Sequence, residues 1–231
     1  MNQDLNRRYD QAQEAVAVRS SESVLQANKV LRNTYALLSM TLLFSAMTAG
    51  LAMAINAPVM NPFIVLIAYF GLLFATTKTR NSGLGLVFVF ALTGFMGFTL
   101  GPILELYMTA LPNGSQLVMQ ALGGTGIIFL GLSAYALTTQ KDFSFMGGFV
   151  MVGMLVMIVA VIANLFMQIP AVSLAISAGV ILLMSALILW QTSEIIHGGE
   201  TNYIMATVSL YISIYNLFTS LLHLLGAMND E

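Results

Sequence analysis

Residues 202–223, NYIMATVSLYISIYNLFTSLLH, contain the pattern that decides the fold of this chain. Polar or small side chains recur there at alternating gaps of four and three residues, which places them in one line along one face of a helix. The members of this polar stripe are Asn202, Ala206, Ser209, Ser213, Asn216, Ser220 and His223. Most other positions are apolar, and the two remaining threonines can each bond a carbonyl of the preceding turn.

The proportions of polar and apolar surface on this helix are the reverse of those on the surface helix of a soluble protein. An unpaired polar group in hydrocarbon costs on the order of 1–3 kcal/mol, so the stripe is expected to face protein or water. The helix is therefore predicted to lie inside a bundle, with other helices around it.

The composition indicates that this bundle is a membrane protein. The chain has 231 residues, of which 58% are hydrophobic and 8% are charged, and its mean hydropathy is +0.86. A soluble domain carries about 25% charged residues. The sequence contains no cysteine, which excludes disulfides and thiolate metal sites.

The chain divides into a polar tail, residues 1–28, and a membrane domain, residues 29–231. Each predicted span is close to the ~20 residues that cross a bilayer. The spans are about 34–56, 61–77, 83–109, 116–138, 145–167, 171–196 and 203–226. A secretory signal peptide is the competing interpretation of the N-terminal region. The first apolar run is longer than the ~7–15 residues of a signal peptide's apolar region, so an uncleaved first span is expected.

The distribution of basic residues predicts the orientation. All eight Lys and Arg residues fall before span one, between spans two and three, or between spans four and five. With seven spans these three places lie on the same side, and basic residues mark the cytoplasmic side. The N-terminus is therefore predicted to be cytoplasmic, and residues 229–231 are predicted to lie on the far side.

Two arrangements could suggest an enzyme. Ser133 and His223 resemble a serine protease pair, but the predicted spans separate them by roughly 20 Å along the membrane normal. A nucleophile and its base need hydrogen-bonding distance. Glu194, His197 and Glu200 form E-x-x-H-x-x-E, but one histidine next to two glycines is a weak metal site, and capping or loop roles are favoured. No catalytic residue, metal or cofactor is predicted.

Glu105 is the one charged residue well inside a predicted span, at a depth similar to that of His223. An ionisable residue inside a membrane is a functional candidate, so a Glu105–His223 pair could form an outer gate or proton site. Glu105 could equally reach the outer interface. Glycines in spans three, four and five indicate close helix packing instead of a ligand site. These are Gly94, Gly97, Gly101, Gly123, Gly124, Gly126, Gly131, Gly147, Gly148 and Gly153.

Several stretches resemble the Bax inhibitor family of membrane proteins. Residues 97–104, GFTLGPIL, are similar to its G-x-x-aliphatic-G-P-x-L signature, with Gly97, Gly101 and Pro102 at the signature positions. Residues 121–129, ALGGTGIIF, are similar to a companion A-x-x-x-T-small-x-x-F motif, with Gly126 where Ala or Ser is usual. The resemblance covers nearly all of 30–226. Residues 135–148 and 196–203 fit the bacterial YccA-like branch.

The resemblance implies six helices around a central seventh, in agreement with the polar stripe. It also implies two behaviours. Some members leak calcium under the control of an aspartate pair, whose positions fall here on Gln191 and Ser213. Both acids are absent, which puts a pH-gated calcium mechanism in doubt. YccA-like members are substrates and inhibitors of FtsH, a membrane-anchored ATP-dependent protease of the bacterial cytoplasmic membrane.

Two functions remain open at this point. The favoured hypothesis is a regulatory membrane protein, not an enzyme, whose partners are the lipid bilayer and an FtsH-type protease. The alternative is a calcium or proton leak channel lined by the polar stripe. No nucleic-acid partner is expected, and the sequence leaves the ion and the oligomeric state open.

Overall fold

The computed structural model describes the backbone of residues 2–229 and the side chains of residues 25–229. All regular secondary structure in this range is α-helical and forms seven helices. They are α1 (Asn2–Ala54), α2 (Pro62–Thr79), α3 (Gly83–Ala110), α4 (Gly114–Thr139), α5 (Met146–Met167), α6 (Pro170–Ile196) and α7 (Tyr203–Asn229). Each contains an apolar stretch long enough to cross a bilayer. The prediction of an all-α protein with seven transmembrane helices is confirmed.

Local residue chemistry sets most helix ends. Proline occupies the first position of both α2 and α6, where its missing N–H costs nothing. The Asn61 side chain caps α2 by accepting a hydrogen bond of 2.9 Å from the Phe63 N–H. Gln140 and Gln168 end α4 and α5 in the left-handed conformation, at φ 49° and 50°. The ends of α2 to α7 lie within three residues of the predicted spans.

The first helix begins much earlier than the predicted span. α1 runs for 53 residues without a break, through the polar segment and into the apolar part, Leu25–Ala54. The physical reason is that no glycine or proline occurs before Gly50, and the polar segment is rich in good helix formers. The predicted boundary at residue 28 therefore falls inside a helix. The side chains of residues 1–24 lie outside the described residues.

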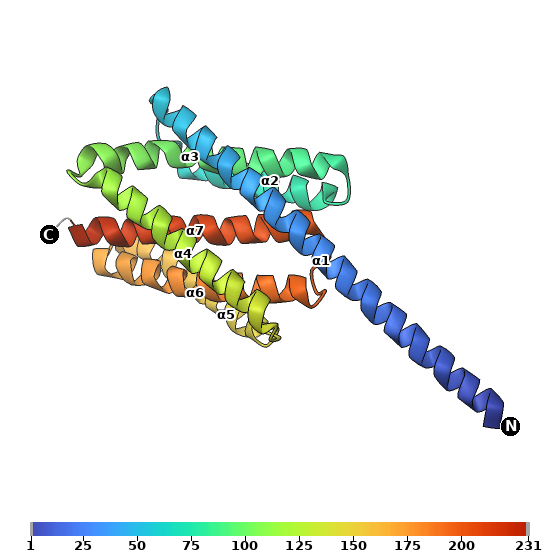
Figure 1. Cartoon of the computed structure of the whole chain (residues 1–231). Coiled ribbons are helices and arrows are strands. Elements are labelled where there is room, and N and C mark those ends of the chain that lie inside the picture. The colour runs from blue at the N-terminus through green and yellow to red at the C-terminus, as the bar shows by residue number, and fades with distance from the viewer. Residues whose placement is uncertain (1, 230–231) are drawn as a thin grey trace.

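The bundle is built from two three-helix units on either side of α7 (Figure 1). In one unit α1 and α2 pack against α3, and in the other α4 and α5 pack against α6. α7 runs between α3 and α6, while α1 and α4 cross one face of the bundle (Figure 1). No residue between 202 and 227 is exposed. The seventh helix is thus central, with α1, α3, α4 and α6 as its main neighbours.

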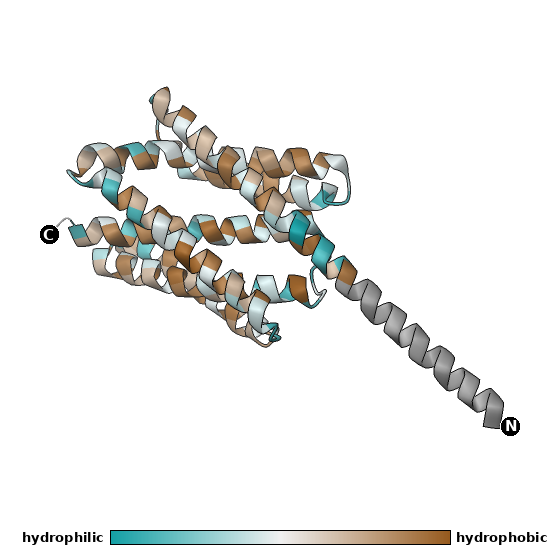
Figure 2. Cartoon of the chain, viewed as in Figure 1, coloured by the Kyte–Doolittle hydropathy of each residue, from teal (hydrophilic) through white to brown (hydrophobic). Residues whose placement is uncertain are grey.

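Hydrophobic residues occur along every helix of the bundle (Figure 2). Their side chains fill the interior and also remain exposed on the outside. Leu210 and Leu217 of α7 are fully buried in the core. On the outer helices, Ile67 of α2 and Phe166 of α5 are among many large apolar side chains that remain exposed. Exposed apolar surface of this extent fits a surrounding of lipid acyl chains.

Two ends of the bundle can be distinguished. The loops 80–82, 140–145 and 197–202 meet at one end, here called the basic end because Lys78, Arg80 and Lys141 lie there. Asn202 joins two of these loops, since its amide nitrogen donates to the Arg80 carbonyl at 3.1 Å. The loops after α1, α3 and α5 and the C-terminal end of α7 form the opposite end.

The glycines differ in what they face. A Cβ atom at Gly97 would collide with the Ser45 carbonyl of α1, and one at Gly101 would lie 2.6 Å from the Ala49 carbonyl. These glycines let α1 and α3 approach closely. The packing prediction is wrong for four others, because added Cβ atoms there would meet no neighbour within 4 Å. These are Gly123, Gly126, Gly131 and Gly148, which point away from the neighbouring helices.

Candidate functional site on the central helix

The centre of the polar stripe is a contact between α6 and α7. Ser213 is completely buried, and its hydroxyl donates to the side-chain oxygen of Gln191 at 3.2 Å. The Ser209 carbonyl of the same helix also accepts from this hydroxyl, at 2.9 Å, so the two oxygens share its single proton. The two residues to which the family resemblance assigns an aspartate pair are therefore in contact. They offer neutral oxygens only, and neither side chain titrates near neutral pH.

A small cavity leads from the basic end toward this contact. Its volume is about 160 Å³, and its walls include Gln191, Glu194, Glu200 and Ser209. The Glu200 carboxylate accepts a hydrogen bond of 2.7 Å from the Asn202 N–H. Both glutamates are half-buried. The entrance from the basic end is therefore acidic, while the inner contact between Gln191 and Ser213 is neutral.

Asn202, the first member of the stripe, has a structural role. Its side-chain oxygen accepts hydrogen bonds from the Ile204 and Met205 N–H groups, at 3.0 and 3.1 Å, and caps α7. Its amide nitrogen also donates to the Asn81 side chain at 2.8 Å. The stripe thus begins with a cap that ties the start of α7 to the α2–α3 loop.

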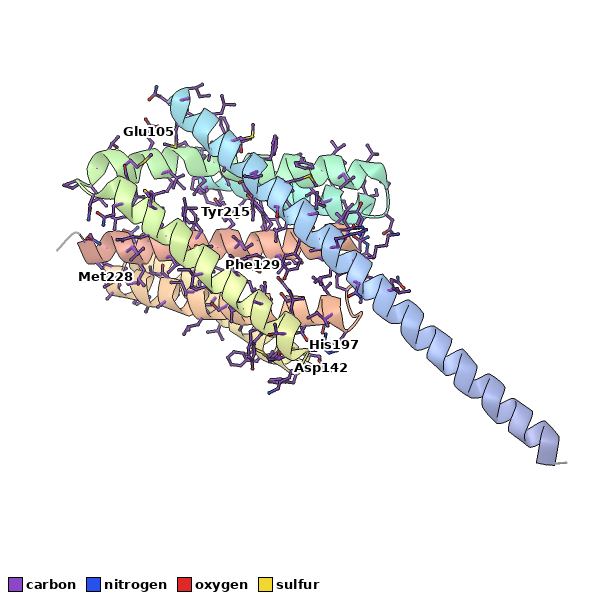
Figure 3. All side chains as sticks on the ribbon, viewed as in Figure 1. Glu105, Phe129, Asp142, His197, Tyr215 and Met228 are labelled. Carbon is purple, nitrogen blue, oxygen red and sulfur yellow. The ribbon has the colours of Figure 1, made fainter. Side chains whose placement is uncertain are left out.

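His197 fastens the α4–α5 loop to the end of α6. Its Nδ1 lies 2.9 Å from the Ser193 carbonyl, and its Nε2 lies 3.2 Å from the Gln140 carbonyl. Ser193 strengthens the connection, because its hydroxyl accepts the Phe143 N–H at 3.0 Å. Figure 3 shows His197 beside Asp142 at this end of the bundle. Hydrogen bonds from the backbone and side chain of Ser144, with a smaller effect of the His197 charge, lower the pKa of Asp142.

The E-x-x-H-x-x-E sequence does not assemble a metal site. Among residues 25–229, no three His, Cys, Asp or Glu side chains come close enough together to hold a metal ion. His197 instead uses both ring nitrogens on backbone carbonyls. This agrees with the interpretation of these residues as loop and cap groups.

The far half of the stripe contains His223, whose Nδ1 shares a hydrogen bond of 2.8 Å with Ser177 of α6. Within the described part of the chain no ion pair or hydrogen bond joins His223 to Glu105. Glu105 is half-buried near the end of α3 (Figure 3). Asn216 donates to the Ile212 carbonyl of its own helix at 2.8 Å, and Ser220 is half-buried.

The serine protease alternative finds no support in the geometry. The Ser133 hydroxyl is buried on α4 without a hydrogen-bond partner, and His223 is bonded to Ser177. No base is therefore within hydrogen-bonding reach of Ser133 in the described structure.

Sequence reasoning missed Tyr211, a residue of α7 whose hydroxyl joins two other helices. The Tyr211 hydroxyl donates to the Thr93 carbonyl of α3 at 3.1 Å, so its single proton is used there. It therefore accepts from the Ser45 hydroxyl of α1, at 2.6 Å. Tyr211 is 1% exposed. It lies on the apolar part of the helix, where no pattern marks a tyrosine as a tie between three helices.

Comparison with known proteins places this architecture in a family. The family described as inhibitor of apoptosis-promoting Bax1 matches residues 27–230. The modulator of FtsH protease YccA of Escherichia coli is 52% identical over 204 residues, which cover 88% of this chain and 92% of the relative. An uncharacterised protein of Pseudomonas aeruginosa is 56% identical over 206 residues, 89% of this chain and 92% of the relative.

A more distant relative covers the chain almost completely. An uncharacterised protein of Campylobacter jejuni is 36% identical over 232 residues, which cover 98% of each chain. The family match and these relatives all extend across the seven-helix bundle, including the signature around Gly97 and Gly101. The chain belongs to the Bax inhibitor family of membrane proteins.

Proposed function

We propose that this protein is an inner-membrane regulatory protein that binds an FtsH-type membrane-anchored protease and restrains its activity. The observation that carries the proposal is the 52% identity, over nearly the whole length of both chains, to a relative named modulator of FtsH protease. The candidate site supports it, because hydrogen bonds tie the central helix to α1, α3 and α6 and so oppose unfolding of the bundle.

The orientation of the bundle belongs to the same proposal. The basic end faces the cytoplasm, because all eight Lys and Arg residues lie in the first part of α1 or in the last turn of α2 and the loops at that end. The N-terminal segment is then cytoplasmic and available to a protease that pulls on a free end. The C-terminal end of α7 lies on the periplasmic side.

The bundle explains how a substrate could act as an inhibitor. Extraction of the chain from the N-terminus must first pull α1 away from α3 and α7, against the Gly97 and Gly101 contacts and the Ser45–Tyr211 hydrogen bond. A protease that stalls on this structure remains occupied. The protein would thus act by being slow to unfold, without chemistry of its own.

The test is capture from native membranes followed by a competition assay. A photo-crosslinker in the α4–α5 loop, for example at Ser144, should trap the protease, and raising the level of this protein should slow turnover of a second membrane substrate. A crosslinker at Phe166, at the opposite end, is the control and should trap less protease. Unchanged turnover of the second substrate, with no protease captured, would reject the proposal.

A calcium or proton leak is the second candidate, and one observation favours it. The 160 Å³ cavity with Glu194 and Glu200 leads from the basic end to Gln191, next to the stripe. Against it, the contact beyond this cavity consists of neutral groups, and Ser213 is fully buried. Ion flux into vesicles distinguishes this candidate from the regulatory one.

A further inference from the structure

A second cavity lies in the opposite half of the bundle, on the face that α1 and α4 cross. Its volume is about 270 Å³, and α1, α3, α4 and α7 all contribute to its walls. Ile214 and Phe218 of α7 line it although they are only 7% and 5% exposed. For comparison, an apolar cavity of about 150 Å³ is enough to bind benzene.

The cavity opens sideways toward the membrane. Ala46 and Gly50 of α1 and Leu122 of α4 line it, and all three are exposed on the outside of the bundle. A Cβ atom at Gly50 would meet nothing within 4 Å, so small residues keep this entrance clear. α1 and α4 touch through the Tyr35 and Phe129 rings, whose centroids are 6.0 Å apart, but the two helices do not pack along each other.

The polar groups in the walls already have partners. The Ser45 and Tyr211 hydroxyls bond each other, and the Thr125 hydroxyl bonds the Ala121 carbonyl at 2.7 Å. The Tyr215 hydroxyl interacts with Thr99, and Figure 3 shows Tyr215 and Phe129 on the face that α1 and α4 cross. Because the wall hydroxyls are already hydrogen-bonded within the bundle and most other wall residues are apolar, the walls favour an apolar occupant.

We propose that this cavity is a binding site for one acyl chain of a membrane lipid, which enters between α1 and α4. The medium outside the entrance is hydrocarbon, since Ala46, Gly50 and Leu122 all lie within spans. A whole helix from a partner is about 10–12 Å across and does not fit a cavity of this volume. The residues Tyr211 to Phe218 give the site a length of about 10 Å along α7.

The position of the cavity identifies the leaflet. The wall residues of α1 run from Leu42 to Met53, one residue before the end of α1, away from the basic end. The bound acyl chain therefore belongs to a lipid of the leaflet at the end opposite the basic end. A bound acyl chain would fill the space between α1 and α7, next to the Ser45–Tyr211 hydrogen bond.

The test uses the full chain in lipid nanodiscs that contain a phospholipid with a photoreactive diazirine near the end of one acyl chain. After irradiation, peptide mapping should find label on Ile214 and Phe218, which bulk lipid cannot reach. Gly50→Leu fills the entrance, and labelling of these two residues should fall about tenfold, the change expected for losing burial of about two methylene groups.

Gly71→Leu is the matched control. Gly71 is an exposed glycine on α2, a Cβ atom there meets nothing within 4 Å, and it is not a wall residue of the cavity. Labelling of Ile214 and Phe218 should be unchanged in this variant. Ala46→Leu is a second way to block the entrance if Gly50→Leu does not fold.

Three results would overturn the proposal. If the label in the unmodified protein is found only on exposed residues, the lipid surrounds the bundle and does not enter the cavity. Label on Ile214 and Phe218 that persists in both blocked variants means that the lipid does not enter between α1 and α4. A photo-crosslinker at Ala46 that captures a polypeptide in native membranes, with no lipid label on α7, means that a partner's side chain occupies the cavity.

Discussion

Ser213 on α7 donates a hydrogen bond of 3.2 Å to Gln191 on α6, and Ser213 is completely shielded from the surroundings of the bundle. The family resemblance predicts that these two residues stand at the positions of an aspartate pair in calcium-leaking members. Two carboxylates this close would share a proton and titrate in two steps. A serine and a glutamine keep the same contact without charge, so the contact is insensitive to pH.

The first prediction concerns ion flux. The unmodified protein should show little pH-dependent calcium leak in liposomes, because neutral oxygens do not offset the cost of dehydrating the ion. Gln191→Asp combined with Ser213→Asp should introduce a leak that differs between about pH 6 and about pH 8, since the pair would then titrate. Gln191→Asn with Ser213→Asn is the uncharged control. A strong pH-switched leak from the unmodified protein would move the channel function to first place.

The second prediction concerns the N-terminal segment. Deletion of residues 2–20 should leave an inserted and folded protein, because the described contacts of the bundle begin after Leu25. We expect FtsH to stop degrading this variant, since the end that the protease pulls has been removed. A pulse-chase measurement in cells checks this, with deletion of residues 230–231 as the control. Equal turnover of the full and shortened chains would show that engagement occurs elsewhere.

The third prediction is that α7 is shielded from lipid all round. The chain has no cysteine, so single cysteines can be placed directly. Cysteines at Ser209, Ser213 and Asn216 should resist a lipid-soluble thiol reagent, and so should those at Val208 and Leu217, which are 1% and 0% exposed. A cysteine at Phe149 of α5 should react strongly. Reaction at Val208 and Leu217 alone would move α7 to the rim of the bundle.

The fourth prediction concerns Tyr211. Tyr211→Phe should lower the free energy of unfolding by about 1–3 kcal/mol, because the change removes two hydrogen bonds and leaves buried polar partners unpaired. Ser45→Ala should cost less. The double variant should be less destabilised than the sum of the two, because both remove the same hydrogen bond. Denaturant titration in detergent checks this, and additive losses would mean that the two hydroxyls do not interact.

The fifth prediction concerns the loop that His197 holds. Both ring nitrogens face backbone carbonyls, so the ring ties the α4–α5 loop to the end of α6. His197→Ala removes both contacts, so the loop should be held less firmly in this variant. Amide hydrogen exchange of residues 140–146 should show less protection in His197→Ala than in the unmodified protein. Equal protection in the two proteins would mean that His197 does not hold the loop.

Asp142 makes the same loop sensitive to acid. Its pKa is lowered from an ordinary value of 3.8, so the stabilisation from its carboxylate is present above this value and is lost only as the pH falls through the lower one. The other charged groups nearby, Lys141 and Glu194, flank the loop and the end of α6. Asp142→Asn is the control, and protection of its loop should not fall further when the pH is lowered below 3.8. An acid-induced loss of protection that persists in this variant would exclude Asp142 as its source.

The local features of the fold could be read directly from the sequence. The polar stripe predicted a shielded helix, and the apolar runs predicted spans whose ends lie close to those of α2 to α7, because periodicity and run length depend only on residues that are close in the chain. The contact between Gln191 and Ser213 agrees with the family resemblance, which assigns an aspartate pair to these positions. The continuous α1 was missed because polarity was taken as the end of a helix, although nothing in the segment breaks one.

Tertiary structure alone decided which side chains pair. The rotation and tilt of each helix brought Ser177 to His223 in place of Glu105, and brought Ser45 and Thr93 to Tyr211. Tertiary structure also decides which glycines contact a neighbouring helix. Gly97 and Gly101 face α1, while Gly123 and Gly126 face open space. The residue type is identical, and only the rotation of its helix relative to the neighbours determines whether it serves packing. Sequence spacing specifies the faces of one helix, but the face that meets a neighbour depends on contacts distant in the chain.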